Sequence, residues 1–61
     1  MRLEEFLDLY SNWNNDVVIN DDKLNPIVKG LPSYILSCDN VGGKEVVAFG
    51  FYDGELAVRV K

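Results

Sequence analysis

Apolar residues recur at helical spacing over the first thirteen positions of the chain. They form one stripe with the period of an α-helix. The stripe consists of Leu3, Phe6, Leu7, Tyr10 and Trp13. Glu4, Glu5 and Asp8 fall on the opposite side, and acids near the first turn favour the helix dipole. The pattern predicts an amphipathic helix that ends near Trp13, where Asn14–Asp16 favours a turn, with Trp13 as a lid on the core.

Two apolar-polar alternating segments, 44–52 and 55–61, flank the pair Asp53-Gly54 near the carboxyl end. Asp-Gly is preferred in two-residue type I′ turns, which require positive φ at both residues. This turn aligns apolar residues on one face, and a slip by one residue would separate every pair. The pairs are Phe51 with Leu56, Phe49 with Val58, and Val47 with Val60. The segment therefore predicts a β-hairpin whose Val47/Phe49/Phe51 face belongs to the core.

The same register defines the other face of the hairpin. Its pairs are Tyr52 with Glu55, Gly50 with Ala57, Ala48 with Arg59, and Val46 with Lys61. Small residues therefore meet in the middle of this face. Two interpretations remain open: an ordinary solvated face, or a surface shaped for close approach by another backbone or a second subunit.

The middle of the chain is less clearly patterned. Val17–Ile19 is β-branched throughout and predicts a short strand over Val17–Asn20. The segment near Ile27 favours a return strand in which Pro26, lacking an N–H, would lie at an edge. Residues 34–38 form either one helical turn begun by Pro32 or another strand.

These elements predict a single α+β domain spanning residues 1–61. An amino-terminal amphipathic helix packs on a small antiparallel β-sheet that ends in the carboxyl-terminal hairpin. With 61 residues and 48% apolar composition, the chain suits one small domain, which buries only about 60% of its unfolded surface. Since the chain has one cysteine and no histidine, neither a disulfide scaffold nor a zinc module is expected.

Ten acidic and six basic residues give a net charge of −4, and residues 1–22 hold six of the acids but one base. This sign opposes direct binding to a phosphate backbone. The acidic residues form either a solubilising surface or a contact surface for a basic protein that handles nucleic acid. The candidate partner-binding residues are Glu4, Glu5, Asp8, Asp21, Asp22 and Tyr52.

Signals for catalysis and cofactor binding are missing. The chain has no histidine, and no base is placed beside Cys38, which we interpret as a small buried hydrophobic residue. The oxygen-bearing residues 16–25 lack the spacing of a calcium loop. We therefore expect no catalytic residue, no metal and no cofactor. Without a signal peptide or an apolar span, we expect a cytoplasmic protein.

Residues 44–61, together with the opening segment Leu3–Tyr10, resemble small uncharacterised accessory proteins of phages and mobile elements in Gram-positive bacteria. Anti-CRISPR proteins are among such short, acidic chains. The resemblance implies a non-enzymatic, stoichiometric inhibitor of a basic, nucleic-acid-handling host protein, such as a Cas nuclease. The alternative is a structural or regulatory homo-oligomer that uses the small-residue hairpin face.

Overall fold

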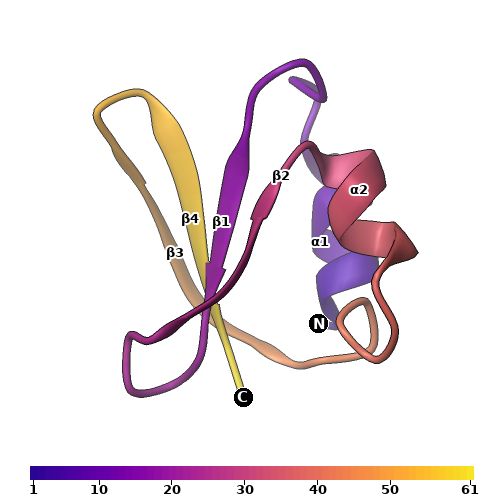
Figure 1. Ribbon diagram of the computed structural model, residues 1–61, viewed down its shortest axis with the longest axis vertical. Helices are drawn as coiled ribbons and strands as arrows, with labels where there is room; N and C mark the ends of the chain where they lie inside the picture. Colours follow the sequence, from indigo (N-terminus) through magenta and orange to yellow (C-terminus); the bar gives the residue numbers. More distant parts are fainter.

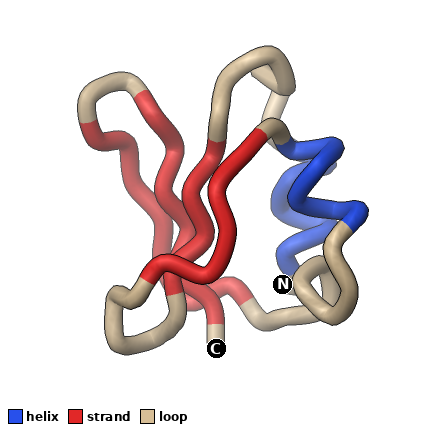
Figure 2. Tube along the Cα trace, in the orientation of Figure 1, coloured by secondary structure: helices blue, strands red, loops and turns tan.

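Two short helices lie against one face of a four-stranded sheet in the computed structural model, which describes residues 1–61 (Figures 1 and 2). The elements are α1 (Leu3–Leu9), β1 (Val17–Asn20), β2 (Pro26–Gly30), α2 (Pro32–Ser37), β3 (Val46–Tyr52) and β4 (Glu55–Val60). The predicted α+β class is confirmed. Neither helix is long and apolar enough to cross a membrane.

The strand order is β2-β1-β4-β3, so the last strand of the chain lies inside the sheet. β1 pairs with β2, and β3 with β4, in antiparallel ladders. β1 and β4 run parallel, and the sheet is therefore mixed instead of wholly antiparallel. The connection between β1 and β4 is long and passes through α2, which allows the two strands to run parallel. In β1 and β4, buried residues alternate regularly with partly exposed ones, and the two strands lie side by side beneath the helices.

The structure settles the middle of the chain. The predicted strand at Val17–Asn20 is confirmed, and the segment near Ile27 forms β2 at an edge of the sheet, as Pro26 requires. Within residues 34–38, the chain is helical up to Ser37 as part of α2, and Cys38 is the extended residue that ends the helix. Pro32 occupies the first turn of that helix, where its missing N–H has no intrahelical partner to lose.

Helix α1 is shorter than the apolar stripe predicts. It ends at Leu9, and Tyr10 already has extended backbone angles. Trp13 lies outside the helix and remains 36% exposed, and its Nε1 donates a hydrogen bond to the Leu7 carbonyl at 3.0 Å. The Leu7 carbonyl also accepts a hydrogen bond from the Tyr10 backbone N–H at 3.1 Å, so the indole adds a second bond at the end of the helix. Ser11 and Asn12 favour local turns over helix, which explains the early end.

The core lies between the helices and the central strands. Its buried members are Leu3, Leu7, Val17, Ile19, Ile35, Val41, Leu56, Val58 and Val60. The predicted core role of Val47, Phe49 and Phe51 is wrong, because these side chains are 45%, 61% and 60% exposed. Strand β3 is at the edge of the sheet, and the seven-residue α1 leaves its outer side uncovered.

The hairpin prediction is confirmed near the turn. Asp53 and Gly54 have φ of 54° and 82°, and Phe51 and Phe49 lie opposite Leu56 and Val58 as predicted. The register shifts between Val46 and Ala48, so Val46 lies opposite Val60. The predicted pairs Val47 with Val60 and Val46 with Lys61 are therefore wrong. A β-bulge inserts one extra residue there, which ordinary turn rules do not reveal.

Candidate functional site

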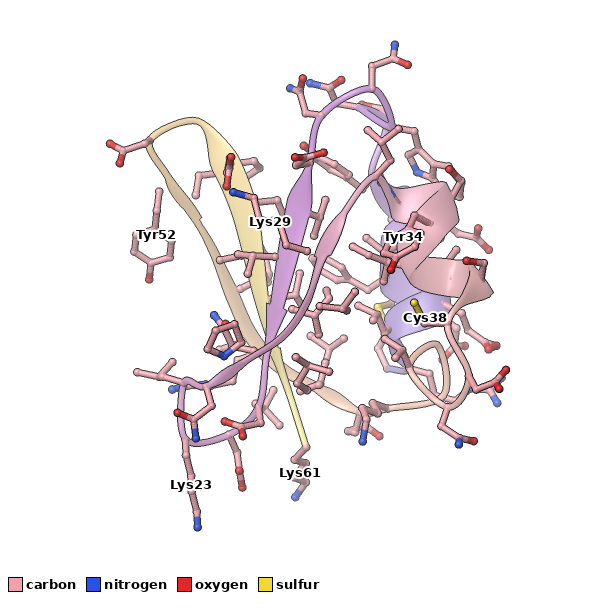
Figure 3. All side chains as sticks on the ribbon, viewed as in Figure 1. Lys23, Lys29, Tyr34, Cys38, Tyr52 and Lys61 are labelled. Atoms are coloured by element: carbon pink, nitrogen blue, oxygen red, sulfur yellow. The ribbon has the colours of Figure 1, made fainter.

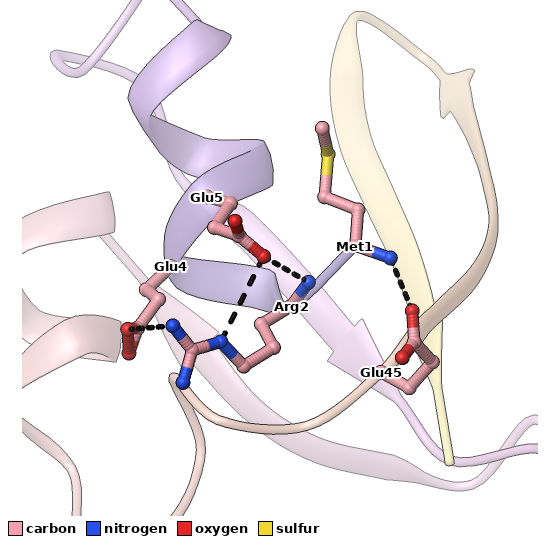
Figure 4. A network of polar contacts seen from close by, with 5 residues as sticks. All are labelled: Met1, Arg2, Glu4, Glu5 and Glu45. Atoms are coloured by element: carbon pink, nitrogen blue, oxygen red, sulfur yellow. Dashed lines mark hydrogen bonds and ion pairs between the residues drawn. The ribbon is translucent and has the colours of Figure 1, made fainter.

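The acidic residues at the start of α1 surround Arg2 (Figure 4). Arg2 Nη2 lies 3.7 Å from Glu4 Oε2, and Arg2 Nε lies 3.7 Å from Glu5 Oε1. The Arg2 backbone N–H also donates to Glu5 Oε1 at 2.9 Å, and this bond holds the pKa of Glu5 below its ordinary value. Glu5 therefore helps to begin the helix, whereas Asp8, one turn further along, is exposed.

Asp21 has a structural task in the β1–β2 turn. Its Oδ1 accepts hydrogen bonds from the backbone N–H groups of Asn25 and Lys23, both at 2.9 Å. The bond from Asn25, followed by that from Lys23, lowers the pKa of Asp21. The neighbouring Asp22 is exposed. Of this acidic pair, only Asp22 is free of a fold-forming hydrogen bond.

The structure does not bring the six candidate residues together. Glu4, Glu5 and Asp8 belong to α1, on the side of the molecule away from the β3–β4 turn (Figure 1). The β1–β2 turn, marked by Lys23, and the side chain of Tyr52 project from other parts of the molecule (Figure 3). The acidic surface predicted from the sequence is therefore divided between separate regions.

The sheet face opposite the helices carries the small residues predicted for it. Gly50 lies opposite Ala57, and Ala48 opposite Arg59, as expected. These four residues line a shallow depression, which is completed by Asn20, Leu24, Phe49 and Tyr52. The ring of Tyr52, a residue that is 71% exposed, would be 3.5 Å from a Cβ placed on Gly50. Tyr52 thus belongs to this depression.

A second surface, which sequence reasoning assigned to the core, lies along β3 and the adjoining side of α1. We call it the apolar edge and define it as Val47, Phe49 and Phe51 with Leu9 and Met1, all at least 45% exposed. Two shallow grooves run beneath it, and every residue that lines either groove is hydrophobic. The grooves share Phe6, Leu9 and Phe49.

Ring contacts fix the position of the apolar edge relative to α1. The centroids of Phe6 and Phe49 are 4.9 Å apart with the rings tilted by 53°, and those of Tyr10 and Phe51 are 6.4 Å apart. Tilted pairs at these separations are favourable. The inner sides of the two β3 rings are thus held by the helix, while their outer sides face solvent.

The two edge strands of the sheet differ in protection. Strand β2 carries Pro26 and Lys29, and Lys29 Nζ lies 3.4 Å from Glu55 Oε1. Proline and lysine at an edge discourage pairing with another strand. Strand β3 has seven residues, none of them charged or proline. The start of β3 is paired on its outer side, where the Val46 N–H donates to the Met1 carbonyl at 2.8 Å and Arg2 forms a bridge with Glu45. Beyond Val46, the apolar edge combines exposed side chains with a strand that carries no charge and no proline.

No chemistry-bearing cluster accompanies these surfaces. Cys38 is partly buried against the core, and its Sγ lies 3.5 Å from the Tyr34 carbonyl oxygen. No three histidine, cysteine, aspartate or glutamate side chains come together as metal ligands. No buried side-chain nitrogen or oxygen lacks a hydrogen-bond partner.

Comparison with known proteins returns no family model, no curated protein and no solved structure that matches this chain.

Proposed function

We propose that this protein is a non-enzymatic binding protein that acts by stoichiometric contact with another polypeptide through the apolar edge. The observation that carries the proposal is the exposure of Phe49 and Phe51, 61% and 60%, on an uncharged edge strand. At about 200 Å² per phenylalanine, the two rings alone expose on the order of 240 Å². Val47, Leu9 and Met1 extend this area into the range in which apolar patches mark interaction sites.

A polypeptide fits this surface better than a small molecule does. The grooves beneath the apolar edge are shallow, and their lining lacks the convergent polar groups that orient a small ligand. An edge strand instead offers a row of backbone groups at the spacing of an extended chain. Apolar side chains beside that row supply pockets for alternate side chains of the added strand.

Site-specific photocrosslinking in the cells that make the protein tests this proposal. A photoreactive phenylalanine analogue replaces Phe49, and the control carries it at Asp22, an exposed position in the β1–β2 turn. We expect a discrete polypeptide adduct from position 49 that is absent from position 22. No adduct from position 49, or the same adducts from both positions, would contradict the proposal.

The acidic side of α1 supports a second candidate function, inhibition of a basic nucleic-acid-handling protein. Asp8 is exposed, no basic residue lies in the last turn of α1, and the Glu4–Arg2 pair is solvent-exposed. Exposed pairs of this kind contribute little energy, so Glu4 is available to a basic partner. The resemblance of residues 44–61 to phage accessory proteins favours a nuclease as that partner.

Cleavage of DNA by a purified Cas9-type nuclease tests the second candidate. We expect the wild-type protein to inhibit cleavage at equimolar amounts, and less so at higher salt. The double variant Glu4→Lys/Asp8→Lys, which keeps the helix-starting Glu5, should lose inhibition, whereas Asp39→Lys at another exposed acid should not. Wild-type protein that leaves cleavage unchanged would exclude this candidate for that nuclease.

A further inference from the structure

We infer that the partner of the apolar edge is a second copy of this chain, joined by antiparallel pairing of β3 with β3 about a twofold axis at Gly50. The two four-stranded sheets would then form one continuous sheet. This inference rests on the proposed function, because it names the polypeptide that the apolar edge contacts. It differs from oligomerisation through the small-residue face, which would stack sheets instead of extending them.

The backbone of β3 directs hydrogen-bonding groups toward its outer edge. Tyr52 and Glu55 bracket the two-residue turn, and pairing alternates from there between hydrogen-bonded and non-hydrogen-bonded pairs. The N–H and C=O groups of Phe49 and Phe51 therefore point away from β4, toward the outer edge. Neither residue takes part in the backbone hydrogen bonds made outside the helices and strands.

Twofold symmetry satisfies these outward groups. When Gly50 lies opposite Gly50 of the second copy, Phe49 of each copy faces Phe51 of the other. All four residues then direct both backbone groups across the new interface, as a hydrogen-bonded antiparallel ladder requires. The pairing is isologous, so the same strand supplies both halves and the contact closes.

The side chains suit the same register. Paired residues of an antiparallel ladder project to the same face, so Phe49 and Phe51 of both copies gather on the helix side. Their outer ring surfaces, which α1 leaves exposed, would cover one another. On the opposite face, Gly50 meets Gly50 without a side chain between the strands, and Ala48 lies opposite Tyr52 of the second copy.

Charge and the second edge favour a dimer over other occupants. Val46–Tyr52 contains no charged residue, so self-pairing brings no like charges into the ladder despite the net charge of −4 on each copy. At the start of β3, the Glu45 carboxylate is already paired with the amino-terminal ammonium of Met1. Because Pro26 and Lys29 block β2, the sheet stops growing at two copies instead of forming a filament.

A dimer of standard interface size would involve a large share of the surface of each copy. A standard interface buries about 800 Å² on each partner, which is about a fifth of the 3944 Å² surface of one copy. The apolar edge with its two grooves provides the hydrophobic centre, and the β3 backbone provides the directional bonds. A copy with only ten buried residues of 61 also gains core by association.

Disulfide trapping tests the register. In a Cys38→Ala background, Gly50→Cys places two thiols at the twofold axis, where opposed Cα atoms of a non-hydrogen-bonded pair are about 4.5 Å apart. We expect a disulfide-linked dimer under mild oxidation. Asp22→Cys in the same background is the control at an exposed turn and should form no disulfide-linked dimer, although its β3 strands still pair. Equal crosslinking of both variants, or none at position 50, would overturn this register.

Sedimentation equilibrium tests the interface without engineered thiols. Wild-type protein should sediment at twice its 6.9 kDa mass, and Phe49→Lys should weaken dimerisation by roughly a hundredfold or more, because the charge would be buried unpaired. Leu31→Lys, an equally drastic change at an apolar residue that is 41% exposed elsewhere, should remain dimeric. Amide exchange of Phe49 and Phe51 in wild-type protein should slow as concentration rises, a readout that does not depend on any variant folding.

The outcomes separate this inference from the proposed function. A wild-type chain that stays monomeric at millimolar concentration, or a dimer unaffected by Phe49→Lys, would overturn β3 self-pairing. The photocrosslinked adduct at position 49 then decides the broader proposal. An adduct of another mass would leave the binding function standing with a different partner, and the absence of any adduct would overturn both.

Discussion

Strands β3 and β4 present the same alternation of apolar side chains to the same face of the sheet, yet one is buried and the other is not. Leu56 and Val58 on β4 are 1% and 0% exposed. Their cross-strand neighbours Phe51 and Phe49 on β3 are 60% and 61% exposed. Alternation thus identifies the face that turns toward the core, but the extent of the covering layer decides which residues are buried.

Position in the sheet accounts for this difference. Strand β4 lies between β1 and β3, so both of its backbone edges are paired and its side chains lie beneath the helices. Strand β3 pairs with β4 on one side, and on the other side only Val46 is paired, with Met1. The rings of Phe6 in α1 and of Tyr10, just after it, contact β3. The larger side chains are therefore the ones left partly in solvent, which suits a contact surface better than a core.

Truncation of one cross-strand pair should show the largest effect. Leu56→Ala removes a fully buried side chain and should cost about 2–5 kcal/mol in the free energy of unfolding. Phe51→Ala removes a larger side chain but should cost only about 1–2 kcal/mol, because much of the ring is already hydrated. Urea unfolding monitored by circular dichroism measures both values.

The measurement is made at a protein concentration at which sedimentation shows the chain to be monomeric, so that self-association does not bury Phe51. Comparable losses for the two variants would mean that β3 is covered as fully as β4. A smaller loss for Leu56→Ala than for Phe51→Ala would reverse the assignment of the core.

The turn that joins the two strands should give an intermediate effect. Gly54 has φ of 82° and nothing within 4 Å of the position a Cβ would take, so Gly54→Val tests backbone strain without a clash. We expect a loss of about 1 kcal/mol or more, since L-residues resist the left-handed region. Gly43→Val is the control, because Gly43 also has open space but no positive φ, and its effect should stay within about 0.5 kcal/mol.

If Gly54→Val and Gly43→Val are equally stable, the Asp53-Gly54 turn does not fix the register that opposes Phe51 to Leu56. In that case the burial of β4, and not the turn, would determine which residues of β3 and β4 lie opposite each other.

Acidification should give the smallest and most general effect. Backbone hydrogen bonds hold the pKa values of Glu5 and Asp21 below their ordinary values. Each ionised group therefore stabilises the folded chain at pH values above its ordinary pKa, about 4, and this contribution is lost as pH falls through the folded pKa. Stability to urea should decline below about pH 4, and less so in Glu5→Gln/Asp21→Asn, which keeps both acceptors without titrating.

The difference in the free energy of unfolding between Leu56→Ala and Phe51→Ala should not change over that pH range, because neither Glu5 nor Asp21 lies on β3 or β4. If this difference became smaller in acid, the stability of the β3–β4 hairpin would depend on charged groups. An unchanged acid response in Glu5→Gln/Asp21→Asn would mean that other carboxylates govern it.

Local signals were the ones that predicted the fold correctly. Asp53-Gly54 specifies a turn through its own backbone preferences, and the adjoining pairs follow from it. The β-branched run Val17–Ile19 likewise predicts its own strand. The parallel pairing of that strand with β4 could not be predicted, because it joins segments separated by β2, α2 and β3 and depends on how the whole core closes.

Helix α1 shows why spacing alone overestimates an element. Tyr10 and Trp13 continue the helical period, but the chain leaves the helix at Tyr10 and the indole of Trp13 returns by a hydrogen bond to Leu7. Tyr10 packs against the core from an extended segment, whereas Trp13 stays 36% exposed and is not a lid on the core as predicted. Helical spacing of apolar residues therefore does not by itself show that a helix continues.

The sequence located some candidate site residues by exposure but not their grouping. Asp8, Asp22 and Tyr52 are exposed as expected, yet they lie on different elements. The apolar edge was missed because its alternation suits a core strand equally well. One sequence feature could have indicated it. Val46–Tyr52 contains no charged residue and no proline, whereas Pro26–Gly30 contains both a proline and a lysine, which protect an edge strand.

The central place of β4 also has a consequence for the order in which the chain becomes structured. Residues are synthesised from the amino end, so β1, β2 and both helices emerge before the strand that they must surround. Until Glu55–Val60 is complete, β1 and β2 can form only a two-stranded hairpin, which is marginal in water. We therefore expect the domain to become stable only after β4 has been synthesised, and chains arrested before β4 to be more sensitive to proteases than the full chain.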